Sequence, residues 1–453
     1  MTDEPIDGPD EPAPDPFGRE APPPLPADEA IFAGGFGSSA PSPARRRPIA
    51  YLAIVIGLVA MVGGAIFFAR SAGQASGAKT PEAAVQRVFD ALGNEDFLGV
   101  LEALTPAERS LLNGRTQTVA QELGRLGILR KDLDLGKVKG IDLAFTGLQY
   151  QSTSLADGFT AVEIKAGTST YRIDPATSPL GDFVRGLLSS KAAGVVSGSD
   201  DISRDHPVFM AVRQDGSWYV SIGYSMAEQA RRDAGAAVPT FGSGVPGRGA
   251  ATPEAAVDQF LRAAGALDVR RLIELTPPGE AGALHDYAPL FLPDLEKGAK
   301  EARSAFSLTI KSLKLSSQPS GDEAVVKIDT IAFRLTIPGA GVVVDFDGEC
   351  ATIKGAEGFL GLGSNGRLCG KDLARSSGIP GFELKPEAGI VAVREGEVWY
   401  VSPTRTVLDG LIAILKAIQP GDLERFKQFF GAFGFQGYGG PTPRSMQTTL
   451  PHA

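Results

Sequence analysis

The longest apolar stretch of the chain covers residues 49–69 and contains no charged side chain. A helix rises about 1.5 Å per residue, so this stretch spans roughly 30 Å, the thickness of the hydrocarbon core of a bilayer. We therefore predict one transmembrane helix over residues 49–69, with the membrane lipid bilayer as its partner.

The charges that flank this segment predict its orientation. Arg45, Arg46 and Arg47 precede it, whereas Arg70 alone follows it, and positive charge concentrates on the cytoplasmic side of a membrane. The N-terminus is then cytoplasmic, and the chain from a linker at 70–79 onward lies outside the cell membrane. The alternative is a cleaved signal peptide, but the leader before the apolar run is too long for one.

The segment before the membrane helix, residues 1–48, is rich in Pro, Asp and Glu and poor in apolar side chains. It buries too little apolar surface to offset the entropy that ordering would cost. We predict that it is a disordered cytoplasmic tail.

A helical period begins after the membrane segment. Thr80 is placed to cap a helix with Pro81 at its first position. The apolar residues that follow recur at helical spacing, namely Ala84, Val85, Val88, Phe89 and Leu92. A second helix is predicted over 97–104. Thr105 and Glu108 then form a capping box, in which Glu108 reaches back to the start of a third helix that runs to about residue 126.

The period changes to two after the helices, which predicts strands. The strand-like ranges are 141–150, 159–165, 169–173, 208–213 and 217–222, and a hairpin turn is predicted at Gln214-Asp215-Gly216. Helices that precede an antiparallel sheet indicate an α+β fold.

The whole pattern occurs twice. Thr-Pro-Glu-Ala-Ala-Val occupies residues 80–85 and again 252–257, and the segment that ends in Trp-Tyr-Val occurs at 211–220 and 392–401. The strand-like ranges of the second copy are 306–315, 324–328, 331–337, 341–346, 390–394 and 398–402. Such recurrence indicates a tandem repeat, with modules at 80–233 and 252–418, each led by three helices. The Gly/Pro-rich linker 234–251 between them lets the modules pivot unless an interface locks them.

These motifs carry a family resemblance. Three helices that open on Thr-Pro-Glu-Ala-Ala-Val, followed by antiparallel strands that close on a Gly-x-Trp-Tyr-Val-like strand, resemble the nuclear-transport-factor-2-like (SnoaL-like, cystatin-like) cone. The closing match is looser in the second module, where Glu397 and Val398 separate Gly396 from Trp399. The resemblance covers residues 80–225 and 252–402. It implies two tandem cones, each of three helices and a curved antiparallel sheet, behind one transmembrane helix.

The layout also resembles single-pass membrane proteins of actinobacterial type. Cones of this kind serve as enzymes, as ligand pockets and as assembly scaffolds, so the fold alone does not choose a function.

Composition narrows the possible partners. A net charge of -9 and the lack of a basic stripe argue against a nucleic-acid partner. Hydrophobic content of 43% supports folded cores. With 3 His and 2 Cys, few metal ligands are present. We predict no metal and no cofactor.

The two cysteines, Cys350 and Cys369, both lie in the part of the chain that we place outside the membrane, where disulfides persist. We predict a structural disulfide between them. Two free thiols are the alternative. A redox-active pair is disfavoured because such pairs usually have the C-x-x-C spacing.

Candidate catalytic residues are few. His285-Asp286-Tyr287 is the most suggestive cluster, but adjacent residues of a helix face different directions and form no relay. We expect His285 to lie on a helix surface. His206 falls in a predicted loop and has no counterpart in the repeat. Because the sequence also contains no nucleophile elbow and no phosphate-binding loop, we predict no catalytic residues and no enzyme.

The last segments bear on association. Apolar residues at 407–418 predict a helix too short to span a bilayer. The segment 419–453 adds an aromatic stripe between Leu423 and Phe435, which packs in the core or lies on a membrane or a partner, and then a loose tail.

Our leading hypothesis is a non-enzymatic, membrane-anchored envelope protein that acts as a protein-interaction or assembly scaffold, with envelope proteins or itself as partners. This layout resembles the membrane-anchored cones of type IV secretion and conjugation machines, and accessory proteins of mammalian-cell-entry lipid transport. The alternative is an extracytoplasmic module that binds a small apolar molecule, such as a lipid or a cell-wall precursor.

Overall fold

The computed structural model describes residues 77–112, 114–187, 194–338, 340–355, 365–369 and 389–423. The tail predicted at 1–48, the membrane segment predicted at 49–69 and the aromatic segment beyond residue 423 lie outside the described residues. No helix in the described part of the chain is both long and apolar enough to cross a bilayer. The chain divides into the units Met1–Tyr51 and Leu52–Ala453, and every described residue belongs to the second.

The first module opens with helices. They are α2 (Pro81–Gly93), α3 (Phe97–Glu102), α4 (Pro106–Leu112) and α5 (Arg115–Arg125). Thr80 caps α2, as predicted, by accepting a hydrogen bond from the Ala83 amide. The single helix predicted from Thr105 to about residue 126 is wrong. It is two helices, because Gly114 takes a φ of 73°, a left-handed conformation that interrupts a helix.

The sheet of the first module is antiparallel throughout. Its strands are β1 (Ile141–Ala156), β2 (Phe159–Ile173), β3 (Val196–Asp201), β4 (Val208–Gln214) and β5 (Ser217–Ser221). The order is β1-β2-β4-β5, with β3 also paired to β2. The separate strands predicted at 159–165 and 169–173 are one continuous strand. The predicted turn is confirmed, since Asp215 and Gly216 both have positive φ, the conformation of a tight hairpin.

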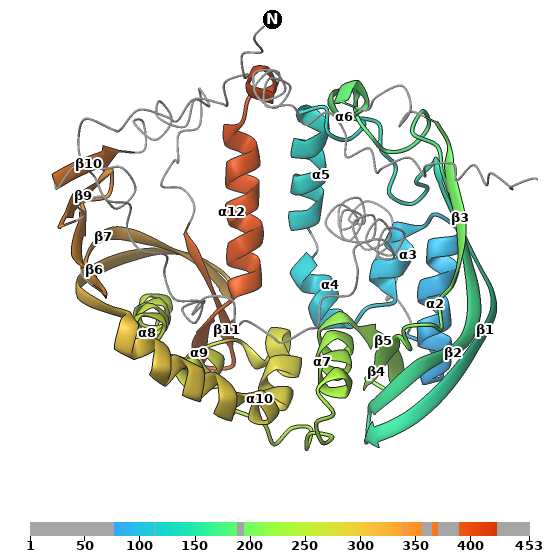
Figure 1. Cartoon of the computed structure of the whole chain (residues 1–453), viewed down its shortest axis with the longest axis horizontal. Coiled ribbons are helices and arrows are strands. Elements are labelled where there is room, and N and C mark those ends of the chain that lie inside the picture. The colour runs from blue at the N-terminus through green and yellow to red at the C-terminus, as the bar shows by residue number, and fades with distance from the viewer. Residues whose placement is uncertain are drawn as a thin grey trace, which may run out of the picture. The chain divides into compact units, whose positions relative to one another are not determined.

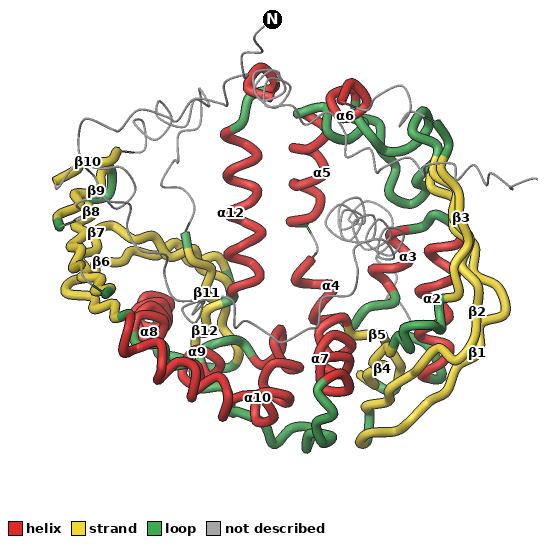
Figure 2. The backbone as a smooth tube through the Cα atoms, viewed as in Figure 1, coloured by secondary structure: helices red, strands yellow, loops and turns green. Residues whose placement is uncertain are grey.

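The core of the first module lies between α2 and its curled sheet, which Figure 2 shows as yellow strands beside the helix. Val85 and Val162 are fully buried there. The ring of Phe89 meets the edges of Phe145 and Phe209 at centroid distances of 4.9 and 5.5 Å. The apolar face predicted for α2 is therefore the buried face of this helix. Aromatic side chains from the helix and from the sheet fill the space that the sheet encloses.

The second module repeats this order. Its helices are α8 (Pro253–Gly265), α9 (Val269–Glu274) and α10 (Pro278–Ala305). Its strands are β6 (Ser307–Ser320), β7 (Glu323–Ile337), β8 (Ala340–Phe346), β9 (Cys350–Lys354), β10 (Asn365–Cys369), β11 (Ile390–Glu395) and β12 (Val398–Val401). The sheet is antiparallel in the order β10-β9-β8-β7-β11-β12, with β6 on β7. The two strands predicted at 324–328 and 331–337 are again one. Mixed α+β architecture with curled antiparallel sheets is thus confirmed.

A helix ends each module (Figure 1). In the second module α12 (Pro403–Ala417) agrees with the helix predicted at 407–418. In the first module α7 (Ile222–Asp233) was not predicted, and Ile222 was assigned to a strand that in fact ends at Ser221. A short helix, α6 (Asp182–Leu187), was also missed.

The repeat extends to individual interactions. The guanidinium of Arg213 lies over the ring of Trp218, and that of Arg394 lies over Trp399, each at 5.8 Å. Ser221 caps α7 and Ser402 caps α12, each by accepting from the amide three residues on. These matches assign residues of one module to equivalent residues of the other.

Candidate functional site between the two modules

The terminal helix of each module packs against the other module. Helix α7 lies beside α10, and α12 lies beside α5 (Figure 1). We call the α7/α10 region the first contact and the α12/α5 region the second contact. The modules therefore do not meet through the linker alone.

The two contacts are reciprocal. In the first, the Tyr287 hydroxyl of α10 donates to Glu228 of α7 at 3.0 Å. In the second, Arg115 of α5 donates to Asp409 of α12 at 2.8 Å. Glu228 and Asp409 are related by the offset that relates Trp218 to Trp399, and Arg115 and Tyr287 by the offset that relates Thr80 to Thr252. Two equivalent surfaces that each contact the other form the pattern of a two-fold dimer interface, here within one chain.

A glutamate anchors each terminal helix. Glu108 accepts from the Ser221 hydroxyl and the Gly223 amide, both at 2.8 Å, and Glu280 accepts from the Ser402 hydroxyl at 2.6 Å. The capping box predicted for Glu108 is therefore only partly right. The Thr105 hydroxyl donates to Glu108, but the Thr105 amide donates to a strand carbonyl, and the carboxylate instead holds the N-terminus of α7.

A buried carboxylate lies at the centre of the first contact. The side chain of Glu228 is 0% exposed, and it accepts hydrogen bonds from Arg231, Arg232 and Tyr287 at distances between 2.7 and 3.0 Å. Burial alone would raise the pKa of Glu228, but these hydrogen bonds outweigh it and hold the pKa below its ordinary value. Glu228 is thus a charged group that both modules surround.

Phe241, from the predicted linker, closes the first contact. Its ring stacks on Phe159 at a centroid distance of 4.3 Å, and its centroid lies 6.0 Å from Tyr224 and 5.8 Å from Tyr287. The Gly242 amide donates to Asp286 at 2.8 Å. A linker that could pivot was one possibility left open by the sequence. In the structure it is docked against both modules.

The cluster at residues 285–287 is structural. His285 is 6% exposed, with Nδ1 2.6 Å from the Val245 carbonyl, so its predicted place on a helix surface is wrong, because the linker covers that face of α10. Asp286 accepts from the Tyr224 hydroxyl, whereas Tyr287 donates to Glu228. The three residues have separate partners, and no relay connects them. His206 is exposed and lies 3.3 Å from a carboxylate oxygen of Glu163.

Charged side chains dominate the second contact. Arg115 lies between Glu323 at 2.5 Å and Asp409 at 2.8 Å, and Arg405 joins Glu323 at 2.7 Å to Glu280. Burial opposes the charged form of Glu323, but the two guanidiniums outweigh it and lower its pKa. An apolar patch around Leu415 extends this contact along α5. Arg125 adds hydrogen bonds to the last carbonyls of α12, at Leu415 and Ile418.

A cavity of about 340 Å³ opens beside the second contact. Helix α4 and the first turns of α10 and α12 line it, together with the ends of β6, β7 and β11. Its charged lining residues are Glu280, Asp322, Glu323, Arg394, Glu395 and Arg405. The carboxylate of Glu395 accepts from the Gly279 amide with both oxygens, each at 3.1 Å, and burial raises its pKa. Six charged side chains therefore line the cavity, which lies where the modules meet.

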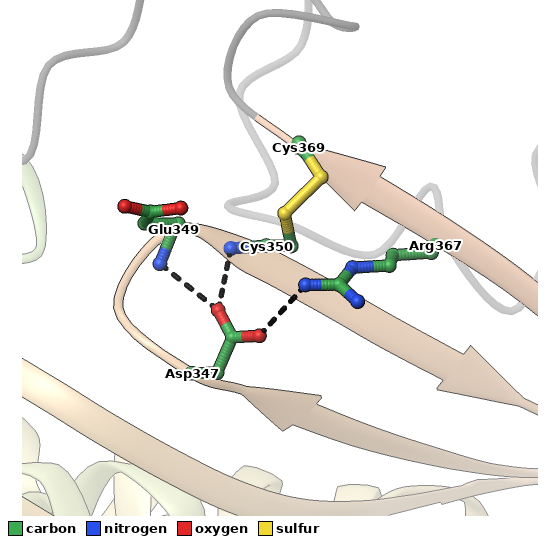
Figure 3. Close-up of a disulfide and its surroundings, with 5 residues drawn as sticks. All are labelled: Asp347, Glu349, Cys350, Arg367 and Cys369. Atoms are coloured by element: carbon green, nitrogen blue, oxygen red, sulfur yellow. Dashed lines mark hydrogen bonds and ion pairs between the residues drawn. A yellow bond between two sulfur atoms is a disulfide. The ribbon is translucent and has the colours of Figure 1, made fainter.

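The predicted disulfide is confirmed. Cys350 and Cys369 are directly opposite each other on β9 and β10, and their sulfurs are bonded (Figure 3). Asp347 accepts from the Cys350 amide at 2.8 Å and forms an ion pair with Arg367 at 3.1 Å. In the second sheet β10 is the edge strand and β9 is its neighbour, and β8 and β7 lie between them and β11. The disulfide thus holds the sheet edge and takes no part in the contacts between modules.

Several residues of this region were missed by sequence reasoning. Glu228, Asp409 and Arg115 belong to no recognisable sequence motif. The offset between the two repeats nevertheless places two acids, Glu228 and Asp409, at equivalent positions. Phe241 is an isolated aromatic residue in a Gly/Pro-rich segment, which is a sign of a docked segment. Among the described residues no group of three or more His, Cys, Asp and Glu side chains has the arrangement of a metal site.

In comparisons with known proteins, no family model, no curated protein and no solved structure matches the chain.

Proposed function

We propose that this chain is a non-enzymatic scaffold of the cell envelope, in which two nuclear-transport-factor-2-like cones form one rigid body outside the membrane. Residues 49–69 anchor it, and residues 1–48 extend into the cytoplasm. In this proposal the surface of the joined modules binds envelope proteins or a second copy of the chain.

The observation that carries the proposal is the pair of reciprocal contacts between the modules. A scaffold must hold its binding surfaces at fixed positions, and a linker alone would leave them free to pivot. The buried Glu228 and the docked Phe241 restrict that pivoting. Side chains such as Phe89, Phe145 and Phe209 occupy the concave side of the first sheet, which favours a role for the outer surface.

The alternative, binding of a lipid or an apolar cell-wall precursor, needs an apolar cavity. The cavity at the second contact does not favour it, because six charged side chains line that cavity. An acyl chain would gain little there and would strip water from the ion pairs.

Native mass spectrometry of the full-length protein, extracted gently from its own membrane, tests the proposal. We expect stoichiometric protein subunits or a defined homo-oligomer. A monomer that carries a reproducible extra mass of lipid size would overturn the scaffold and favour the ligand-binding alternative. Glu228→Ala is the informative variant, because a looser pair of modules should lose those subunits, whereas the exposed-site variant Val238→Ala should keep them.

A further inference from the structure

The two contacts differ at corresponding positions. Phe159 opens β2 opposite Val212, and Glu323 opens β7 opposite Val393, so register makes Phe159 and Glu323 equivalent. Tyr224 and Arg405 are equivalent because the backbone amide of each donates a hydrogen bond to the serine that caps its helix. In the first contact Phe159 and Tyr224 pack on Phe241, a side chain from an extended segment. In the second contact Glu323 and Arg405 line the cavity.

The charge of the cavity is not balanced. Its lining holds the carboxylates of Glu280, Asp322, Glu323 and Glu395 and the guanidiniums of Arg394 and Arg405. Arg394 forms an ion pair with Asp322, and Arg405 forms ion pairs with both Glu280 and Glu323. Arg115, which also pairs with Glu323, and Asp409 adjoin the cavity. They add one positive and one negative charge, so the excess of negative charge is unchanged.

Glu395 is the carboxylate of this lining that no cation in the described ranges pairs with. Its carboxylate oxygens accept from the Gly279 amide, and among the described residues it forms no ion pair, because Arg405 attracts it only from farther away. A half-buried carboxylate without a cation is costly, and a cationic side chain would neutralise it.

We propose that the cavity binds a Lys or Arg side chain that a partner protein presents on an extended segment, with Glu395 as its main anionic contact. A volume of about 340 Å³ lies at the low end for ligand sites and leaves ample room for one long side chain. The equivalent positions of the first contact already receive one side chain of an extended segment, that of Phe241. The proposal rests on the scaffold function and names the chemistry of its partner.

Peptide titration of the full-length protein in detergent tests the cavity. The probe is acetyl-Gly-Gly-Lys-Gly-Gly-amide, and its control carries norleucine, which lacks the charge, in place of lysine. We expect the lysine peptide to bind at least tenfold more tightly than the norleucine peptide, and Glu395→Gln to weaken it about tenfold. Glutamine still accepts from the Gly279 amide, so this variant keeps its fold. Glu397→Gln, on the same hairpin but outside the cavity, should change nothing. Equal affinity for both peptides, no binding of the lysine peptide, or equal effects of the two variants would overturn the proposal.

Native mass spectra of the wild type and these two variants separate this proposal from the scaffold function. Loss of protein partners in Glu395→Gln but not in Glu397→Gln supports the cavity as the docking site. Partners that stay at wild-type stoichiometry in Glu395→Gln refute the docking site and leave the scaffold standing. A wild-type chain without protein partners refutes the scaffold, and the peptide titration then judges the cavity by itself.

Discussion

The two contacts share one reciprocal geometry but have different interiors. The first contact surrounds a fully buried carboxylate and fills its remaining space with Phe159, Tyr224, Tyr287 and Phe241. The second contact holds the ion pairs of Glu323 and Asp409, each of which keeps 30% of its side-chain surface in water, and a cavity opens beside it. After duplication, equivalent surfaces are free to specialise. The interior of the first contact is closely packed, whereas the second contact has a net negative charge beside a cavity.

Desolvation explains why the two contacts should differ in strength. An ion pair that water still reaches gains little, because water screens the attraction. A fully buried charge depends on every hydrogen bond it receives, and the loss of a partner leaves the others uncompensated. Substitutions at equivalent positions should therefore have unequal effects.

The largest effect is expected for Glu228→Ala. It leaves Arg231, Arg232 and the Tyr287 hydroxyl without their shared acceptor, and we expect a loss of about 3 kcal/mol in the free energy of unfolding. Its counterpart Asp409→Ala should cost about 1 kcal/mol, because its partner Arg115 keeps Glu323. Urea denaturation of both variants measures the difference. Equal losses would show that the two contacts contribute equally to the stability of the chain and do not differ in strength.

Phe241→Ala should have the second largest effect. It removes a stacked ring from a cluster that joins the linker to both modules, and we expect a loss of about 2 kcal/mol. Hydrogen exchange should also rise at the Gly242 amide, which donates to Asp286. Val238→Ala, at a linker position that is 45% exposed, is the control and should change neither quantity. Unchanged exchange in Phe241→Ala would mean that the linker is held by other groups.

The sequence predicted the local structure well, for reasons visible in particular residues. Thr80 with Pro81, and Asp215 with Gly216, are local signals that need no tertiary context, and both were interpreted correctly. The pairing of Cys350 with Cys369 followed from there being 2 Cys in the chain. The contacts between modules were not predicted, because pairs such as Arg115 with Asp409 join distant segments that carry no motif. The structure of α7 was missed because the strand period continues into Ile222, where the chain becomes helical.

A smaller effect is expected for Arg115→Ala. This side chain is 14% exposed and bridges Glu323 and Asp409, but both acids can take up water when it is removed. We expect a loss of about 1 kcal/mol in the free energy of unfolding. A double-mutant cycle with Glu323→Ala isolates the pair. Coupling as large as that between Glu228 and Arg231 would contradict the weaker role assigned to the second contact.

The smallest effect on stability should come from mild acid, which tests the difference between the two contacts without removing any atom. The pKa values of Glu228 and Glu323 are lowered in the folded chain from an ordinary value of 4.5. Their stabilising contributions are therefore complete above pH 4.5 and are lost as the pH falls through the lowered values.

Glu395 acts in the opposite sense, because burial raises its pKa, so that protonation relieves a cost at the second contact. Acid should then weaken the first contact more than the second, because at the second contact the gain at Glu395 offsets part of the loss at Glu323. On acidification, stability should accordingly fall less in Glu228→Gln, and more in Glu395→Gln, than in the wild type. The reverse order would place the pH-sensitive charge of the joined modules at the second contact, beside the cavity.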